Sequence, residues 1–264
     1  MELSSSKPWI NQIAKAGLIA KGIVYVLLGA LAFMAAFEIS NTSNNDVGKS
    51  GVFGSIKEWP AGKWLLSILA AGLTCYSIWR LIQAFAANHG KEIKWPKRLR
   101  YLFSALAYLA LAFSAAQIIF YNQQDSSDQN QHWAAEILSK SHGQWLLGLG
   151  ALAIAAIGIY QVYYGLSEKY KKHVAQGGYH STIERTLVRT GKIGYVSRGL
   201  VWLILAYLLL NAALHASASE AGDTGKAFEF VEGSFGSVLL GVLGIGLMLY
   251  GIFNFIRAQH EKFA

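Results

Sequence analysis

The chain has 264 residues, of which 53% are hydrophobic and only 14% are charged, and its formal net charge is +8. This apolar share excludes a disordered chain, because an ordinary soluble domain reaches about 45–50% only when glycine is counted as well. Three prolines and one cysteine exclude collagen-like, proline-rich and disulfide-stabilised proteins. The apolar residues are gathered in long segments, so each segment is considered separately.

Six segments are long and apolar enough to cross a bilayer. A transmembrane helix needs about 20 predominantly apolar residues to span a hydrocarbon core about 30 Å thick. These six segments are apolar on all sides, whereas a helix of a soluble core has a charged opposite face. In chain order they cover residues 13–37, 64–87, 99–121, 145–166, 194–215 and 237–258. The sequence therefore predicts an all-α integral membrane protein with six spans.

Lys21, Arg80 and Arg198 lie near one end of the spans that contain them. From Lys21 to the end of the first span, and from the start of the second span to Arg80, the helix rises only about 24 Å. Side chains at this depth can reach the headgroups by snorkelling. The three cations are therefore candidate contacts for lipid headgroups. A phosphate or headgroup site formed by Lys21 and Arg198 is the alternative to simple anchoring.

The distribution of charge predicts the orientation. If the six spans alternate, 18 of the 23 Lys and Arg residues lie on the side of the termini, together with only five of the 15 acidic residues. By the positive-inside rule, both termini of this multi-pass protein face the cytoplasm, and the protein belongs to the cytoplasmic (inner) membrane. The cations are spread over four juxtamembrane segments, which favours anionic lipid headgroups on the cytoplasmic side as partners and argues against nucleic acid.

The opening of the first span is repeated twice along the chain. Residues 17–25, GLIAKGIVY, recur as residues 194–202, GYVSRGLVW, and a weaker copy, RYLFSALAY, covers residues 100–108. The second span of each unit begins with G-x-x-L-L and later carries two aromatic residues three positions apart. These aromatic pairs are Tyr76 and Trp79, Tyr160 and Tyr163, and Tyr250 and Phe253. One membrane domain, residues 1–264, is thus built from three two-span units over approximately residues 7–90, 91–176 and 177–264.

The G-x-x-(A/S)-(K/R)-G-x-x-(Y/W) opening, the three tandem units and the G-x-x-L-L motif resemble the bacterial membrane family catalogued as domain of unknown function 1206. The resemblance covers nearly the whole chain. The middle unit departs from the pattern, with Ser104 in place of the cation and Ala105 in place of the glycine, which leaves its register open. The resemblance implies a prokaryotic multi-span membrane protein and supplies no established activity.

Each unit has an even number of spans, so all three units enter the membrane in the same direction. They can be related by an axis along the membrane normal, and a pseudo-threefold bundle of six helices is the simplest closed arrangement. The outer loop of each unit has an amphipathic pattern that predicts a short helix on the outer surface. The apolar positions are Val52, Ile56 and Trp59, then Trp133 and Ile137, then Phe228, Val231 and Phe235.

The tryptophans predict two aromatic belts, one at each surface of the bilayer. The outer belt consists of Trp59, Trp64, Trp133 and Trp145, and the inner belt consists of Trp9, Trp79, Trp95 and Trp202.

Residues with catalytic potential are scarce. No predicted span contains an Asp or Glu, which argues against ion-coupled transport, because intramembrane carboxylates are the usual proton or sodium relays. The sequence has no phosphate-binding loop, no paired carboxylates and no CxxC motif. We therefore expect no catalytic residues, no metal, no cofactor and no enzymatic activity.

Gln117 and Asn211 are candidate axial polar positions. The repeat offsets place them with Met34 at one level near the outer end of the odd-numbered spans. Hydrogen bonding between neighbouring helices is the favoured interpretation of these amides, and a pore lining is the alternative. The sequence thus favours a non-enzymatic accessory or scaffold with an unidentified membrane-protein partner. The alternative is a passive channel, or a small-solute or lipid transporter, through the bundle axis.

Overall fold

The computed structural model describes residues 8–39, 49–58, 60–85, 95–121, 126–168, 170 and 181–260. The regular elements in these residues are all helices, and six of them are long and apolar enough to cross a membrane. These six are α1 (Pro8–Ala36), α3 (Gly62–Phe85), α4 (Trp95–Tyr121), α6 (Gly143–Leu166), α8 (Ser181–Leu214) and α10 (Ser237–His260). The prediction of an all-α protein with six spans is confirmed.

Helix α8 is longer than the fifth span predicted from the sequence. It begins at Ser181, thirteen residues before Gly194. The added segment is polar on most sides, so hydropathy gives no sign of it, but Leu187 is fully buried. Gly191 of this segment lies against the rings of Tyr170 and Phe253. Packing on its neighbours therefore stabilises a part of α8 that extends beyond the apolar span.

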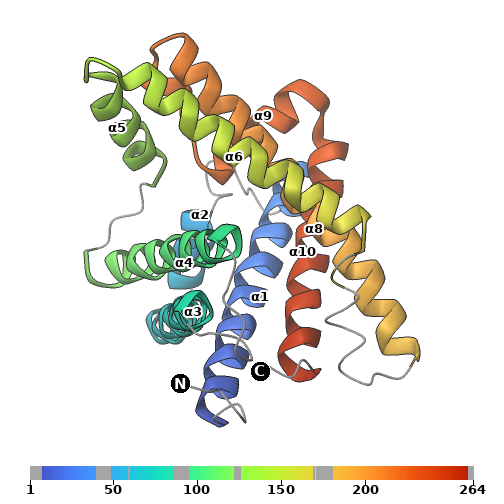
Figure 1. Cartoon of the computed structure of the whole chain (residues 1–264). Coiled ribbons are helices and arrows are strands. Elements are labelled where there is room, and N and C mark those ends of the chain that lie inside the picture. The colour runs from blue at the N-terminus through green and yellow to red at the C-terminus, as the bar shows by residue number, and fades with distance from the viewer. Residues whose placement is uncertain are drawn as a thin grey trace.

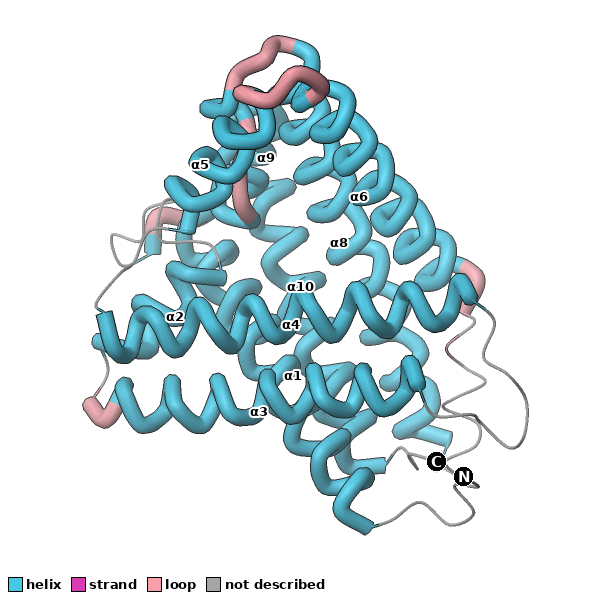
Figure 2. The backbone as a smooth tube through the Cα atoms, turned by 60° about the vertical axis from the view of Figure 1, so that its left-hand side comes forward, coloured by secondary structure: helices cyan, strands magenta, loops and turns pink. Residues whose placement is uncertain are grey.

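The six helices pack in three main pairs, each of which joins two different units. These pairs are α1 with α10, α3 with α4, and α6 with α8. Figure 1 shows α1 and α10 side by side in the middle of the bundle, and Figure 2 shows α3 and α4 side by side along one edge. In each pair the second span of one unit meets the first span of the next, and the third unit returns to the first. This cyclic pattern is the pseudo-threefold arrangement that the repeat predicts.

The middle unit is more open than the other two. The two spans of the first unit, α1 and α3, pack on each other, and so do α8 and α10 of the third unit. Among the described residues, α4 and α6 have almost no backbone contact. The α4 and α6 spans are accordingly the least buried of the six.

Close contacts between backbones fix the register of the main pairs. A Cβ atom at Gly251 would lie 2.6 Å from the carbonyl oxygen of Gly22, and one at Gly199 would lie 3.0 Å from that of Gly158. Gly22 and Gly199 are equivalent in the repeat, so the positions that they contact, Gly251 and Gly158, are equivalent as well.

The third main pair follows the same register. Ser77 of α3 donates a hydrogen bond of 2.8 Å to the carbonyl oxygen of Ala105, the residue at the glycine position of the middle unit. In this register Tyr160 corresponds to Trp79, so the alignment of Tyr160 with Tyr76 by aromatic spacing was wrong by three residues. Gly62 and Gly143, which open their helices, give the same offset of 81 as Ser77 and Gly158.

Each outer loop contains a short helix, as predicted. These helices are α2 (Lys49–Glu58), α5 (Ser126–Leu138) and α9 (Thr224–Phe235), and a 3₁₀ turn, η3 (Ala218–Glu220), precedes the last of them. The α9 helix has an N-cap, because the Asp223 carboxylate accepts hydrogen bonds from the backbone of Gly225 and Lys226. The α2 helix is buried in the bundle, where Val52 and Phe53 are fully covered.

The exposure of the aromatic residues bears on the predicted outer helices and belts. Phe235 is 63% exposed, and Trp133, a member of the predicted outer belt, is 59% exposed. In α5 the smaller Ala134 is buried in its place, which lets the helix approach its neighbours closely. Trp79 is buried and is not part of a surface belt. Trp59 lies outside the described residues.

Candidate functional site

Lys21 lies near the middle of α1 and is only 3% exposed. Its Nζ atom donates to the hydroxyl of Tyr76 in α3 at 3.3 Å. The same atom stands over the rings of Tyr76, Tyr108 and Tyr250, at 5.1, 5.4 and 5.0 Å from their centroids. Aromatic rings from α3, α4 and α10 therefore enclose the ammonium group.

Arg198 occupies the position in the third unit that Lys21 has in the first. Its Nη1 atom donates to the Tyr250 hydroxyl at 2.7 Å. Its guanidinium carbon lies 5.1 Å from the centroid of the Tyr250 ring and 5.3 Å from that of Tyr25. Both repeat copies thus pair a cation of the first span with a tyrosine hydroxyl of the second span of the same unit.

Arg80 approaches the same cluster from α3. Its Nε and Nη2 atoms donate to the Tyr76 hydroxyl at 2.9 and 2.6 Å, and its Nη1 atom donates to the side-chain oxygen of Gln83 at 2.8 Å. The guanidinium carbon stands 4.7 Å from the centroid of the Trp79 ring. The buried Trp79 thus makes a cation–π contact with Arg80 and packs against the ring of Tyr76.

These contacts join three cations and two tyrosines into one sequence, Arg80–Tyr76–Lys21–Tyr250–Arg198, which we call the cation–tyrosine chain. Tyr76 contacts both Arg80 and Lys21, and Tyr250 contacts both Lys21 and Arg198. The structure brings together three cations that the sequence treated as separate anchors. For Lys21 the snorkelling interpretation was wrong, because its ammonium group points into the bundle rather than along the helix toward a surface.

The glycine of the repeated motif explains how each cation reaches its tyrosine. A Cβ atom at Gly17 would lie 2.6 Å from the Cα atom of Tyr76, and one at Gly194 would lie 2.6 Å from the Cα atom of Tyr250. Only glycine permits this approach of the two helices. The cation lies one helical turn later, so its side chain extends across the interface to the hydroxyl.

The middle unit has a different cation–tyrosine contact. Arg100 stands at the glycine position of the motif, and its Nη1 atom donates to the Tyr160 hydroxyl at 3.0 Å. The contact is exposed, and it is displaced by about one turn along both helices from the contacts of the other units. It joins α4 to α6, the two helices of this unit that otherwise have so little contact.

Among the described residues, the helices that form the cation–tyrosine chain carry no carboxylate close to it, and Glu168, which follows α6, is paired with Lys192. Helices α1, α3, α4 and α10 contain no Asp or Glu, and α8 contains only Glu184, fourteen residues before Arg198 and thus about 21 Å along the axis. Each cation–π contact contributes about 2 kcal/mol or more where the cation is desolvated, but neutral rings do not cancel the charge. An arginine side chain stays protonated in proteins.

Two buried donors in this cluster lack a hydrogen-bond partner among the described residues. They are the Nε atom of Arg198 and the hydroxyl of Tyr108. An unpartnered buried group of this kind costs about 1–3 kcal/mol. Sequence reasoning missed Tyr108 as a site residue. The available signal was the aromatic position that ends each copy of the motif, since Tyr108 is the equivalent of Tyr25.

Beyond the end of α6, Tyr170 connects this part of the chain to α8. Its hydroxyl donates to the backbone oxygen of Val188 at 2.6 Å. Burial raises the pKa of Tyr170, and the neighbouring Glu168 carboxylate raises it further. Tyr170 also stacks on Tyr195 and meets the edge of Phe253, so it links three helices near the cluster.

Gln117 and Asn211 are both half-buried. The residue after Gln117, Ile118, belongs to the main apolar core, whereas Ala212 packs in a separate small cluster with Leu147 and Ala221. Helices α4 and α8 are not one of the closely packed pairs. The structure therefore does not bring these two amides into one site.

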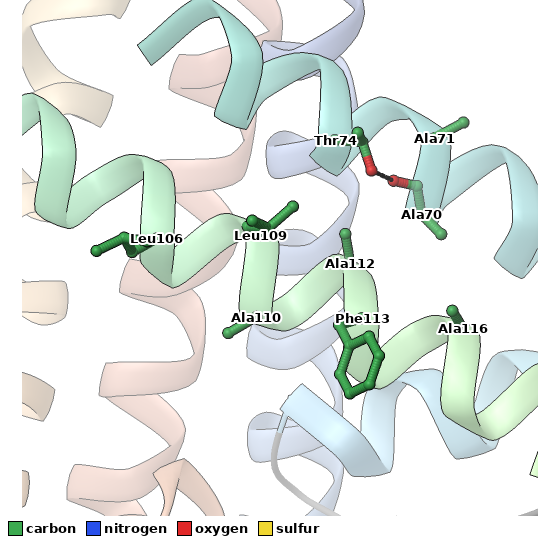
Figure 3. A pocket seen from close by; sticks show the side chains of 9 residues that line it. All are labelled: Ala70, Ala71, Thr74, Leu106, Leu109, Ala110, Ala112, Phe113 and Ala116. Carbon is green, nitrogen blue, oxygen red and sulfur yellow. Dashed lines mark hydrogen bonds between the residues drawn. The ribbon is translucent and has the colours of Figure 1, made fainter. Parts of the chain in front are cut away.

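A groove of about 670 Å³ runs between α3 and α4 (Figure 3). Alanine side chains and the Thr74 hydroxyl line its α3 side, and leucine, phenylalanine and alanine side chains line its α4 side. The Thr74 hydroxyl donates to the carbonyl oxygen of Ala70 at 2.9 Å and is thus occupied within its own helix. The groove is apolar, with Leu106 and Phe113 exposed along it, and has the character of a surface that contacts lipid chains.

Comparisons with known proteins agree with the repeat. The uncharacterized protein YxxB of Bacillus subtilis (strain 168) is 28% identical over 260 residues, which cover 97% of this chain and 93% of YxxB. No solved structure matches the chain. A family model described as Domain of Unknown Function (DUF1206) matches three segments, residues 16–87, 99–168 and 193–260. With most of its length matched, and matched three times in tandem, the chain belongs to this DUF1206 family.

Proposed function

We propose that the protein is a non-enzymatic accessory or scaffold protein of the cytoplasmic membrane, with both termini in the cytoplasm. Its partners are anionic headgroups on the cytoplasmic side and one membrane protein. The unequal distribution of Lys and Arg between the two sides supports the orientation.

The observation that carries the proposal is the apolar packing of α1 against α10. Along this contact a Cβ atom at Gly244 would lie 2.7 Å from the carbonyl oxygen of Gly29, and one at Gly251 would lie 2.5 Å from the Cγ2 atom of Val26. Figure 1 shows this packed pair in the middle of the bundle. From this packing we infer that the protein acts through what it binds.

Flux from reconstituted vesicles tests the proposal against the rival function of a channel or transporter. Full-length protein is placed in liposomes loaded with chloride, phosphate or glycerol, and release is compared with that from protein-free liposomes. We expect equal release of each solute. Faster release that is abolished by replacing Gln117 and Asn211 with leucine would establish the transporter instead.

Photo-crosslinking in native membranes tests the partner. A photoreactive residue in place of Leu149, which is exposed on α6, should give one discrete adduct with another membrane protein. The matched control carries the same residue in place of Leu18, which is fully buried, and should give none. If Leu149 and other exposed positions of α6 capture lipid alone, this face has no protein partner and the scaffold function is rejected.

A further inference from the structure

We propose that the cation–tyrosine chain and Tyr108 form an internal binding site for a phosphate-type anion, supplied either as free phosphate or as the phosphate of a lipid headgroup. With a lipid as the source, this inference deepens and rests on the proposed contact with anionic headgroups; with free phosphate as the source, it is independent of the accessory function. It is carried by the charge of the cluster, by its unpartnered donors and by its depth in the bundle.

The first argument is the charge. Arg80, Lys21 and Arg198 contact the same two tyrosines, and the helices of the cluster place no carboxylate nearer than Glu184. Buried cations are normally paired, because an uncompensated charge in an apolar interior is strongly unfavourable. Among the described residues, the helices of the cluster provide no other carboxylate, and Glu168, which follows α6, pairs with Lys192 at 3.5 Å. A bound anion is therefore the group that completes the pairing of Arg80 and Arg198.

The second argument is the set of unpartnered donors. The Nε atom of Arg198 and the hydroxyl of Tyr108 are both buried, and both can donate a hydrogen bond. The Lys21 ammonium stands over the rings of Tyr108 and Tyr250, and the Tyr250 hydroxyl accepts a hydrogen bond from Arg198, so both donors belong to the cluster around Lys21. Phosphate oxygens accept hydrogen bonds from several such donors at once, and arginine is suited to them.

The third argument is the depth. Lys21 lies 10 residues after the start of the apolar span Asn11–Ala36 and 15 residues before its end, so it is nearer to the side where α1 begins. The chain therefore lies close to the leaflet on the side where α1 begins. Arg80 and Arg198, at its two ends, are half-buried, so an anion from that leaflet or from the solution beyond it can reach them.

Binding to the full-length protein in detergent tests the proposal with two probes. One is radiolabelled inorganic phosphate, measured by equilibrium dialysis. The other is dioleoyl phosphatidylglycerol, with retained lipid measured by native mass spectrometry and with zwitterionic dioleoyl phosphatidylcholine as the comparison. Either anion should bind the wild type, and Arg198→Gln should weaken binding about tenfold or more, because hydrogen bonds to charged groups are the strong ones. Arg198→Lys should restore most of the affinity, since the first unit has lysine at this position.

Tyr108→Phe is the sharper variant, because it removes only the unpartnered hydroxyl. Without anion it should melt at the wild-type temperature or higher, and with anion it should bind more weakly. The matched control is Arg100→Gln, which removes an arginine that also bonds a tyrosine hydroxyl but lies outside the cation–tyrosine chain. Its affinity should stay within about twofold of wild type, as expected for a residue without contact to the anion.

The two probes identify the source of the anion. Binding of phosphate alone indicates a soluble ligand, and binding of phosphatidylglycerol alone indicates a lipid; both support the site if Arg198→Gln and Tyr108→Phe weaken them. The proposal is overturned if neither probe binds the wild type. It is also overturned if the two variants bind as tightly as Arg100→Gln.

Discussion

Replacing Gly194 by alanine tests whether the glycine of the motif sets the distance between α8 and α10. The added Cβ atom would lie 2.6 Å from the Cα atom of Tyr250 and 2.9 Å from its backbone nitrogen. Carbon atoms in contact prefer about 3.5–4.0 Å, so the helices must separate by roughly 1 Å. The obstacle is backbone, which cannot rotate away as a side chain would.

The expected cost follows from two opposing effects. Overpacking of this kind costs about 1–3 kcal/mol, and alanine recovers up to about 1 kcal/mol of helix propensity over glycine. We therefore expect a net loss of about 1–2 kcal/mol in the free energy of unfolding, measured by denaturant titration in mixed micelles. Separation of the helices should also lengthen the 2.7 Å bond from Arg198 to Tyr250.

Gly148→Ala is the matched control, because a Cβ atom at Gly148 in α6 would meet no atom within 4 Å. It should be neutral or slightly stabilising. Gly17→Ala, the repeat equivalent, should behave like Gly194→Ala, since it faces the same contact with Tyr76. If Gly194→Ala is as stable as Gly148→Ala, the close approach does not determine the packing and the interpretation of the motif is refuted.

Three further predictions concern an interface, a titration and the topology. Ser77→Ala should lower the free energy of unfolding by about 1 kcal/mol through loss of the bond to the Ala105 carbonyl, and an unchanged denaturation midpoint would argue against that bond. The raised pKa of Tyr170 means that its neutral form stabilises the fold below pH 10.0, its ordinary value, and that this contribution is lost as the pH rises toward the higher folded value. Melting temperatures above pH 10 should therefore fall less steeply in Tyr170→Phe than in wild type, and parallel curves would contradict the assignment. A reporter fused after Ala264 should read cytoplasmic and one within residues 122–140 should read external, whereas opposite results at both sites would reverse the orientation.

The six helices could be predicted because hydropathy is a local property that 20 adjacent residues reveal. The same reasoning failed at the start of α8. The neighbours of Leu187 and Gly191 in sequence are polar, but tertiary contacts hold these two residues in the fold. The register of the middle unit was also missed. Aromatic spacing aligned Tyr160 with Tyr76 and gave a register wrong by three residues. The correct register is determined by Gly158, which touches the backbone of Gly199.

The cation–tyrosine chain was found only in part. The sequence singled out Arg80, Lys21 and Arg198 as cations within spans, and repeat equivalence connected the last two. It could not show that they share Tyr76 and Tyr250, because the facing sides of helices far apart in the chain are set by packing. Repeat equivalence also suggested a common site for Gln117 and Asn211, but their neighbours pack in different clusters because the middle unit is open.

The pairing of α1 with α10 has a consequence for biosynthesis. Helices enter the membrane in the order of synthesis, so α1 is inserted first and α10, which forms its most extensive contact, is the last of the described helices to arrive. Until then Lys21 lacks the ring of Tyr250 and stands in a half-built bundle. Contacts between segments so distant in sequence form slowly. The nascent protein must therefore pass through an intermediate in which Lys21 lacks part of its aromatic surroundings. This is the stage at which we expect membrane chaperones or insertases to bind the chain.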